Sequence, residues 1–211
     1  MSDNPHQIIE GILDLSPVMP VIVIDDAKDA LPLADALLAG GLKTIEITLR
    51  TPAALAAIEA IASHRPEICV GAGTVVSASL AEAARKAGAS FAVSPGTTPA
   101  VVAGCAAAGL PLLPGASTVS EIMTLHEAEF TAMKFFPASA AGGTAFVKSL
   151  ASPLPQITIC PTGGISTETA AEWLALPNVR CLGGSWVAPQ KLIAGQQFAT
   201  IETLAREAAA L

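Results

Sequence analysis

The sequence predicts an α/β protein built as one (β/α)8 barrel of the TIM type, preceded by a short N-terminal helix. Short apolar segments alternate strictly with helical ones, and eight such pairs follow one another along the 211 residues. The apolar segments are hydrophobic on both faces, as buried parallel strands are. A chain of this length suits a single barrel domain. The alternative is an open doubly wound sheet, which carries a glycine-rich loop after its first strand, where this chain reads Ile24-Asp25-Asp26.

The predicted domain covers residues 1–211, with the N-terminal helix within residues 1–15 and the barrel over residues 18–211. The amphipathic first helix spans residues 5–15, where Ile8, Ile9, Ile12 and Leu13 share one face. The eight expected strands are 18–24, 44–49, 68–72, 90–93, 110–113, 131–136, 157–160 and 179–182.

Helix start and stop signals separate these strands. Threonine followed by proline predicts helix starts at Thr51 and Thr98, and capping-box spacing predicts starts at Ser79 and Thr118. Ser166 is expected to cap a helix that runs through residue 174. The other expected helices are 26–39, 143–150 and 198–209, and glycines at 40, 88 and 109 close the helices that precede them.

Composition excludes several classes of protein. Hydrophobic residues make up 52% of the chain and charged residues 14%, so a large core is expected. The net charge of −7 and the absence of tyrosine argue against a nucleic-acid surface, which is normally basic and aromatic. The histidines (His6, His64 and His126) are scattered, so no metal-ligand cluster is expected.

Cysteine usage and the N-terminus indicate a cytoplasmic protein. The four cysteines lie apart in apolar segments without CxxC spacing, which is typical of reduced core residues. Residues 1–10 contain no apolar core of signal-peptide length, and the chain has no uninterrupted apolar run of about 18 residues. We therefore expect no membrane contact.

The first chemical candidate is Lys134, which interrupts the apolar strand at residues 131–136. Burial disfavours the charged form of an amine, and a free amine in a dry pocket can attack a ketone to form a Schiff base. The alternative is a lysine whose stem packs inside the protein while its ammonium group reaches solvent.

The second predicted strand carries two charged residues, Glu46 and Arg50. Its alternation places Glu46, Thr48 and Arg50 on one face. A glutamate inside a barrel must be paired, because an unpaired buried charge is costly. Glu46 is therefore either a general base or the partner of Arg50 or Lys134 in a purely structural ion pair.

Glycines and hydroxyls follow several strands, at the end of the barrel that carries active sites. Gly71 and Gly73 are expected to let a ligand approach the backbone, and the Thr74 hydroxyl to bind a carboxylate, although packing explains such glycines equally well. The turns at residues 94–97 and 114–117 are expected to line the mouth. Glycine pairs after the seventh and eighth strands, at residues 163–164 and 183–184, are typical of a barrel phosphate site.

Together these groups fit a phosphorylated 2-keto acid. Lys134 supplies an amine, Glu46 a base, Arg50 a carboxylate partner and the last two loops a phosphate cradle. No metal or other cofactor is expected, because a protonated Schiff base is itself the electron sink.

The chain resembles the 2-keto-3-deoxy-6-phosphogluconate (KDPG) and 4-hydroxy-2-oxoglutarate (KHG) aldolase family in its motifs. The matching motifs are Glu46-Ile47-Thr48-Leu49-Arg50, Val70-Gly71-Ala72-Gly73-Thr74, Ser94-Pro95-Gly96, Lys134-Phe135-Phe136-Pro137, Pro161-Thr162-Gly163-Gly164-Ile165 and Gly183-Gly184-Ser185-Trp186. The resemblance implies a cytoplasmic, homotrimeric (β/α)8 lyase of class I. Such an enzyme cleaves KDPG to pyruvate and glyceraldehyde 3-phosphate in the Entner–Doudoroff pathway, and also cleaves KHG.

The resemblance also implies a role for each matching residue. Lys134 is the Schiff-base lysine and Glu46 the proton acceptor. The residues implied in substrate binding are Arg50 and Thr74 for the pyruvate carboxylate, Gly163, Gly164, Gly184 and Ser185 for the phosphate, Thr162 for stereochemistry at C4, and Pro95 and Phe136 within their motifs. One departure is Ser139, where the family often has glutamate.

Two alternatives stay open at this point. The chain could be a galactonate-type phosphate aldolase. It could also be a phosphate-binding barrel without aldolase activity, in which Lys134 only neutralises an anion. Covalent trapping of pyruvate separates the second alternative from the aldolases.

Overall fold

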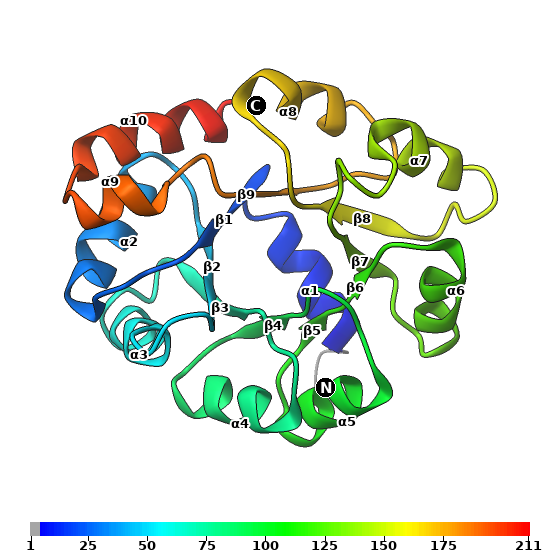
Figure 1. Ribbon diagram of the computed structural model, residues 1–211, viewed down its shortest axis with the longest axis horizontal. Helices are drawn as coiled ribbons and strands as arrows, with labels where there is room; N and C mark the ends of the chain where they lie inside the picture. The colour runs from blue at the N-terminus through cyan, green and yellow to red at the C-terminus, as the bar shows by residue number, and fades with distance from the viewer. Residues whose placement is uncertain (1–4) are drawn as a thin grey trace.

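Parallel strands form an inner layer and helices surround it in the protein, which a computed structural model describes over residues 5–211 (Figure 1). The expectations for residues 1–4 lie outside the described residues. The strands are β1 (Val18–Ile22), β2 (Thr44–Thr48), β3 (Cys69–Gly73), β4 (Phe91–Val93), β5 (Leu112–Leu113), β6 (Gly115–Ala116), β7 (Ala132–Phe135), β8 (Thr158–Pro161) and β9 (Leu182–Gly184).

These strands pair in two parallel sheets. Six of them follow the order β5-β4-β3-β2-β1-β9, and the other three follow the order β6-β7-β8. Isolated parallel bridges join Ile159 to Val179 and Thr162 to Gly183, so β8 and β9 lie side by side. The prediction of an α/β fold with short, buried parallel strands is confirmed.

The predicted turn at residues 114–117 is wrong, because Gly115 and Ala116 form the short strand β6. Pro114 lies between β5 and β6 and has no N–H to donate to a strand ladder. Its carbonyl still accepts from the backbone N–H of Lys134 at 2.8 Å. The expected fifth strand, 110–113, is thus shortened to β5, which pairs with β4, and the unexpected strand β6 follows Pro114 and pairs with β7.

The predicted eighth strand is displaced along the chain. Val179 makes an isolated bridge, but the ladder with β1 starts where Leu182 pairs with Val18 and ends where Gly184 pairs with Pro20. Gly183 and Gly184 have no positive φ and are strand residues, although a glycine pair suggested a loop. Extended glycines are invisible to a reading that assigns glycine to turns.

Most predicted helices are confirmed, with small shifts at their ends. The observed helices are α1 (Pro5–Leu13), α2 (Ala30–Ala39), α3 (Ala54–His64), α4 (Ala78–Lys86), α5 (Pro99–Ala107), α6 (Val119–Glu127), α7 (Gly143–Leu150), α8 (Thr167–Leu174), α9 (Gln190–Ala194) and α10 (Phe198–Ala209), with a 3-10 turn at Ala27–Asp29 before α2. The short helix α9 was not predicted. No helix among residues 5–211 is long and apolar enough to cross a membrane.

Side-chain caps begin several of these helices. Thr98 caps α5, and Thr118 with Glu121 forms the predicted capping box of α6. Ser166 stands at the N-cap of α8, as predicted.

Two predicted helix starts are wrong. The hydroxyl of Thr51 donates to the carbonyl of Ile24 in place of capping, and α3 begins at Ala54. Ser77, not Ser79, caps α4 by accepting from the N–H of Leu80. In both cases a second hydroxyl or a more distant carbonyl competes with the expected local bond.

The core has an outer and an inner part. The outer part fills the space between strands and helices and includes Ile45 and Ile47 of β2. The inner part includes Phe91 and Val93 and is joined by the apolar face of α1, which contacts β5 and β7. In Figure 1 this helix lies in the middle of the view, among the strands. The face predicted for the first helix is therefore buried against the strands.

Two glycines provide a paired test of the packing. A Cβ at Gly40 would lie 2.9 Å from the backbone N of Arg206 and the O of Glu202 in α10, whereas one at Gly11 in α1 meets nothing within 4 Å. We expect Gly40→Ala to lower the free energy of unfolding by about 1–3 kcal/mol through overpacking. Gly11→Ala should raise it by about 0.5–1 kcal/mol through helix propensity. Urea unfolding of both variants measures the difference, and an unchanged midpoint for Gly40→Ala would contradict this packing.

Candidate active site

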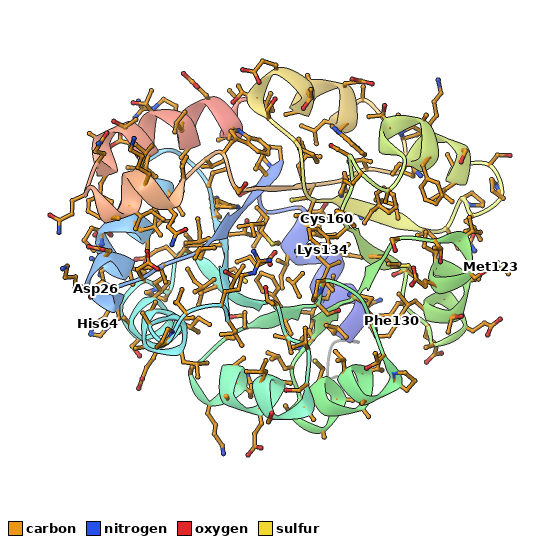
Figure 2. The ribbon with its side chains drawn as sticks, in the orientation of Figure 1. Asp26, His64, Met123, Phe130, Lys134 and Cys160 are labelled. Carbon is orange, nitrogen blue, oxygen red and sulfur yellow. The ribbon has the colours of Figure 1, made fainter. Side chains whose placement is uncertain are left out.

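A buried lysine of β7 and a buried glutamate of β2 meet between the two parallel sheets. Lys134 of β7 is 4% exposed and Glu46 of β2 is 2% exposed. The lysine Nζ donates to Glu46 Oε1 at 3.2 Å and to Oε2 at 3.3 Å. Figure 2 shows Lys134 near the middle of the molecule. Because its side chain is almost fully buried, the alternative of a lysine reaching solvent does not hold.

The alternation predicted for β2 explains how Glu46 reaches this position. Ile45 and Ile47 pack in the outer core, and the intervening glutamate points inward. The Thr48 hydroxyl donates to the carbonyl of Ile22 at 2.7 Å and fixes β2 against β1. Of the two ion pairs considered for Glu46, the structure forms the one with Lys134.

Arg50 lies beyond the end of β2 and is exposed. Its Nε donates to the Thr74 hydroxyl at 2.9 Å, so this bond uses Nε and not the two terminal nitrogens of the guanidinium group. Thr74 has φ of 61°, a left-handed conformation that is unusual for a β-branched residue. Backbone strain of this kind is concentrated at functional sites. The strained threonine and the arginine therefore form one unit at the mouth.

A cavity of about 120 Å³ opens above the lysine. Its lining comes from the ends of β1, β2, β7, β8 and β9 and consists of Val21, Arg50, Lys134, Phe136, Thr162, Gly163, Gly164, Ile165, Gly183 and Ser185. The Phe136 ring centroid lies 5.7 Å from Lys134 Nζ, within cation–π range. A larger hollow of about 460 Å³ lies between α5 and α6, but its only charged lining residue is Glu121.

The structure brings most of the predicted site residues together in this cavity. Thr74 joins it through Arg50, and Glu46 lies against Lys134. Pro95 and Gly184 are not among the lining residues. Gly183, from the glycine pair predicted after the eighth strand, and Ile165, from the motif after the seventh, also line the cavity. Val21 lines it too but was not predicted, because an apolar strand residue carries no chemical signal in the sequence.

The loop after β8 has the shape expected for binding an anion. Gly163 and Gly164 have φ of 101° and 76°, which only glycine adopts readily. The loop runs into the N-terminus of α8, whose free N–H groups favour negative charge. Ser139 supports the loop: its N–H donates to the Gly163 carbonyl at 3.0 Å and its hydroxyl to the Gly164 carbonyl at 2.9 Å.

Gly183 and Gly184 serve packing. A Cβ at Gly183 would lie 2.8 Å from Thr162 Cγ2, and one at Gly184 would lie 2.5 Å from Cζ3 of the Trp186 ring. The turn after β4 binds strand β6. Ser94 accepts from the N–H of Gly115 at 3.1 Å, and Thr97 donates to the Gly115 carbonyl at 2.9 Å.

Three cysteines, Cys69, Cys105 and Cys181, are poor competitors of Lys134 as nucleophiles. Burial raises the pKa of the Cys105 thiol to about 11 and also raises the pKa of Cys69. The neighbouring Cys160 thiol and burial raise the pKa of Cys181. A protonated thiol is a poor nucleophile. Across the described residues, no group of three metal-ligating side chains is placed to hold an ion.

Comparison with known proteins places this chain in a family. Residues 9–204 match the family described as "Aldolase: KDPG and KHG aldolase". The chain is 46% identical over 210 residues to the 2-dehydro-3-deoxy-phosphogluconate aldolase of Pseudoalteromonas atlantica, covering all of this chain and 98% of the relative.

Two similar proteins have been solved with small molecules bound. The KDPG aldolase of Legionella pneumophila, with pyruvate captured as a covalent carbinolamine, superposes with a TM-score of 0.93 at 41% identity, covering 99% of this chain and 100% of that one. The KDPG aldolase of Zymomonas mobilis with 3-phosphoglycerate gives 0.91 at 44% identity, covering 97% and 96%.

The buried pair can be tested by removing one charge or both. We expect Lys134→Met to lower the free energy of unfolding by about 3–5 kcal/mol, because the Glu46 carboxylate is left buried without a partner. Lys134→Met combined with Glu46→Leu should recover most of that loss, because well-packed apolar residues replace a buried ion pair at little cost. Urea unfolding at equal protein concentration measures both. Additive losses in the double variant would show that the two side chains are not coupled.

Proposed function

Because the chain belongs to the KDPG and KHG aldolase family, we propose that it cleaves 2-keto-3-deoxy-6-phosphogluconate to pyruvate and glyceraldehyde 3-phosphate. The chain is thus a carbon–carbon lyase of class I that works through a lysine Schiff base in the Entner–Doudoroff pathway. The observation that carries the proposal is the Lys134–Glu46 pair, 3.2 Å apart beneath a polar cavity. It supplies an amine and an acid–base group at one point.

Lys134 forms the covalent bond. Transfer of a proton from its ammonium group to Glu46 frees the amine, which attacks the C2 ketone and gives a carbinolamine after a proton moves from nitrogen to oxygen. The protonated Glu46 then gives its proton to the departing hydroxyl, so that water leaves and an iminium forms. Capture of pyruvate as a carbinolamine in the Legionella pneumophila relative supports this course.

Glu46 moves the protons of the cleavage step. Its carboxylate accepts the proton of the C4 hydroxyl while the C3–C4 bond breaks, and the electron pair passes to the iminium nitrogen as an enamine. The aldehyde product leaves. The same carboxyl group then protonates C3, and hydrolysis of the new iminium releases pyruvate and the Lys134 amine. General acid–base groups of this kind contribute about 10²–10⁴-fold to rate.

The remaining site residues bind the two ends of the substrate. Arg50 and Thr74 are suited to the pyruvate carboxylate, since a guanidinium and a hydroxyl lie together at the mouth. The loop of Gly163 and Gly164, with Ser185 after the neighbouring strand, lines the cavity and is suited to the phosphate. The family resemblance adds Gly184, which directly precedes Ser185 at the end of β9. Thr162 lines the cavity between these ends, where it can contact the C4 hydroxyl. Phe136 covers the lysine, and Pro95 supports the loop after β4.

We further propose that the two sheets close into one (β/α)8 barrel forming a single domain. The bridges between β8 and β9 and the shared residue Pro114 between β5 and β6 support closure. A homotrimeric assembly in the cytoplasm is the state that the family resemblance favours. No metal or other cofactor is needed, because the iminium accepts the electrons that a Lewis acid would otherwise stabilise.

Unphosphorylated 4-hydroxy-2-oxoglutarate is a second substrate that the family description favours. It requires the same lysine, base and carboxylate partner but leaves the glycine loop unused. The galactonate-type reaction differs only in stereochemistry at C4, near Thr162. The left-handed glycine loop at the N-terminus of α8 therefore favours the phosphorylated substrates.

Reductive trapping tests the covalent step. Incubation with pyruvate and borohydride should modify the peptide that contains Lys134, because only a buried amine beside a base is set to form the imine. Lys134→Met should abolish labelling, while Lys148→Met, on exposed α7, should leave it intact. Peptide mapping by mass spectrometry gives the answer. Labelling at another lysine, or phosphate binding without any labelling, would favour a barrel without aldolase chemistry.

Substrate selectivity tests the phosphate loop. Gly163→Ala adds a Cβ 3.3 Å from the Phe136 ring and strains a residue at φ 101°. Its KM for KDPG should rise about tenfold or more relative to its KM for KHG, because hydrogen bonds to a charged group contribute about 1.5–3 kcal/mol. Gly41→Ala, at φ 94° but remote from the cavity, is the matched control for strain. An equal rise in KM for both substrates would show that this loop does not bind the phosphate.

A further inference from the structure

We propose that Gly73 is a positioning residue for the Glu46 carboxylate. The proposal rests on the role of Glu46 in the proposed function. Gly73 ends β3, where it pairs with Thr48 of β2 and Val93 of β4. Gly73 is buried and, as a glycine, has no side chain that could donate or accept a hydrogen bond. Its effect must therefore come from the space that the missing side chain leaves empty.

The backbone of Gly73 does not require glycine. Its φ is not positive, in contrast to Gly163 and Gly164, so any residue could adopt its conformation. Glycine within a strand weakens the strand, because it has more conformational freedom to lose and no side chain to pack. A residue other than glycine would therefore make a better strand, and the reason for glycine must lie in its neighbours.

The neighbour is the catalytic carboxylate. A Cβ built on Gly73 would lie 2.6 Å from Glu46 Cγ and 2.7 Å from Cδ, and closer still to Oε1. Carbon atoms in contact normally lie about 3.5–4.0 Å apart. A methyl group at residue 73 and the carboxylate at its observed place are therefore mutually exclusive. The expectation that Gly73 lets a ligand approach the backbone is corrected, since Glu46 fills that space.

The carboxylate is confined from two directions. Lys134 Nζ holds both oxygens at 3.2 and 3.3 Å, and the surface of Gly73 supports the other side of the group. Because the carboxylate is the far end of a flexible side chain, an added methyl group turns Glu46 aside without moving β3. Displacements of about 1 Å in a reacting group can cost about 10²-fold in rate. Gly73 thus sets where the base stands.

Gly71 offers a matched control on the same strand. It points to the same side of β3 as Gly73, pairs in register with Glu46, and also has no positive φ. A Cβ there would lie 2.5 Å from Cε1 of the Phe91 ring, which belongs to the inner core. Gly71→Ala therefore adds the same methyl group two residues away but disturbs packing, not the carboxylate.

The experiment is a double-mutant cycle of Gly73→Ala and Glu46→Ala, with Gly71→Ala alongside. Turnover of KDPG and exchange of pyruvate methyl protons with D2O are measured, together with the completeness of borohydride trapping at Lys134. We expect Gly73→Ala to lower turnover and exchange by about 10–100-fold while trapping still reaches completion. The double variant should match Glu46→Ala within about twofold. Gly71→Ala should lower the unfolding midpoint, but it should slow exchange of the pyruvate methyl protons much less than Gly73→Ala does.

The outcomes separate this proposal from the proposed function. Normal turnover in Gly73→Ala, or an undiminished effect of Gly73→Ala in the Glu46→Ala background, overturns the role of Gly73 while the loss in Glu46→Ala keeps the base assigned. Near-normal turnover in Glu46→Ala removes the base itself. If Gly73→Ala alone does not fold, the double variant with Glu46→Ala decides. A double variant that folds supports the steric conflict between the added methyl group and Glu46, and one that does not fold overturns it.

Discussion

The ion pair between Lys134 and Glu46 is the constraint on which the arrangement of the site depends. Both side chains are almost completely removed from water, and each charge would be costly without the other. Their attraction offsets much of this cost only if the two groups are held in contact. The same contact places an amine beside a group that can take and return its proton. Structural stability and reactivity therefore impose the same geometry on these two residues.

The fold meets this constraint by joining residues that are 88 positions apart in the sequence. Parallel strands put the middle of β2 and the middle of β7 on the same inner surface, while the side chains that flank Glu46 pack outward against helices. The α1 helix covers the inner apolar residues on one side, and the loops after β7, β8 and β9 surround the cavity on the other. The polar pair thus lies between an apolar floor and an opening for substrate.

The sequence predicted what depends on local patterns and missed what depends on distant neighbours. The alternation in β2, the caps at Thr98 and Thr118 and the lysine within an apolar strand were all visible, and the structure contains them. The strand β6 after Pro114 was not, because it depends on pairing with β7, a distant segment of the chain. The cap of α4 was misplaced because two serines, Ser77 and Ser79, compete for it. Val21 has no local feature that marks a cavity.

Glycines of two kinds explain why the motifs of this chain are rich in that residue. Gly163 and Gly164 are needed for their left-handed backbone, which shapes a loop able to face an anion. Gly73 and Gly183 have ordinary strand conformations and are needed for volume, since Glu46 and Thr162 occupy the space where their side chains would be. The first kind can be recognised from the turn in which it lies. The second kind is determined by a distant side chain, which is a reacting group beside Gly73 but only a packing residue, Phe91, beside Gly71. Sequence alone therefore does not tell which strand glycines lie against functional groups.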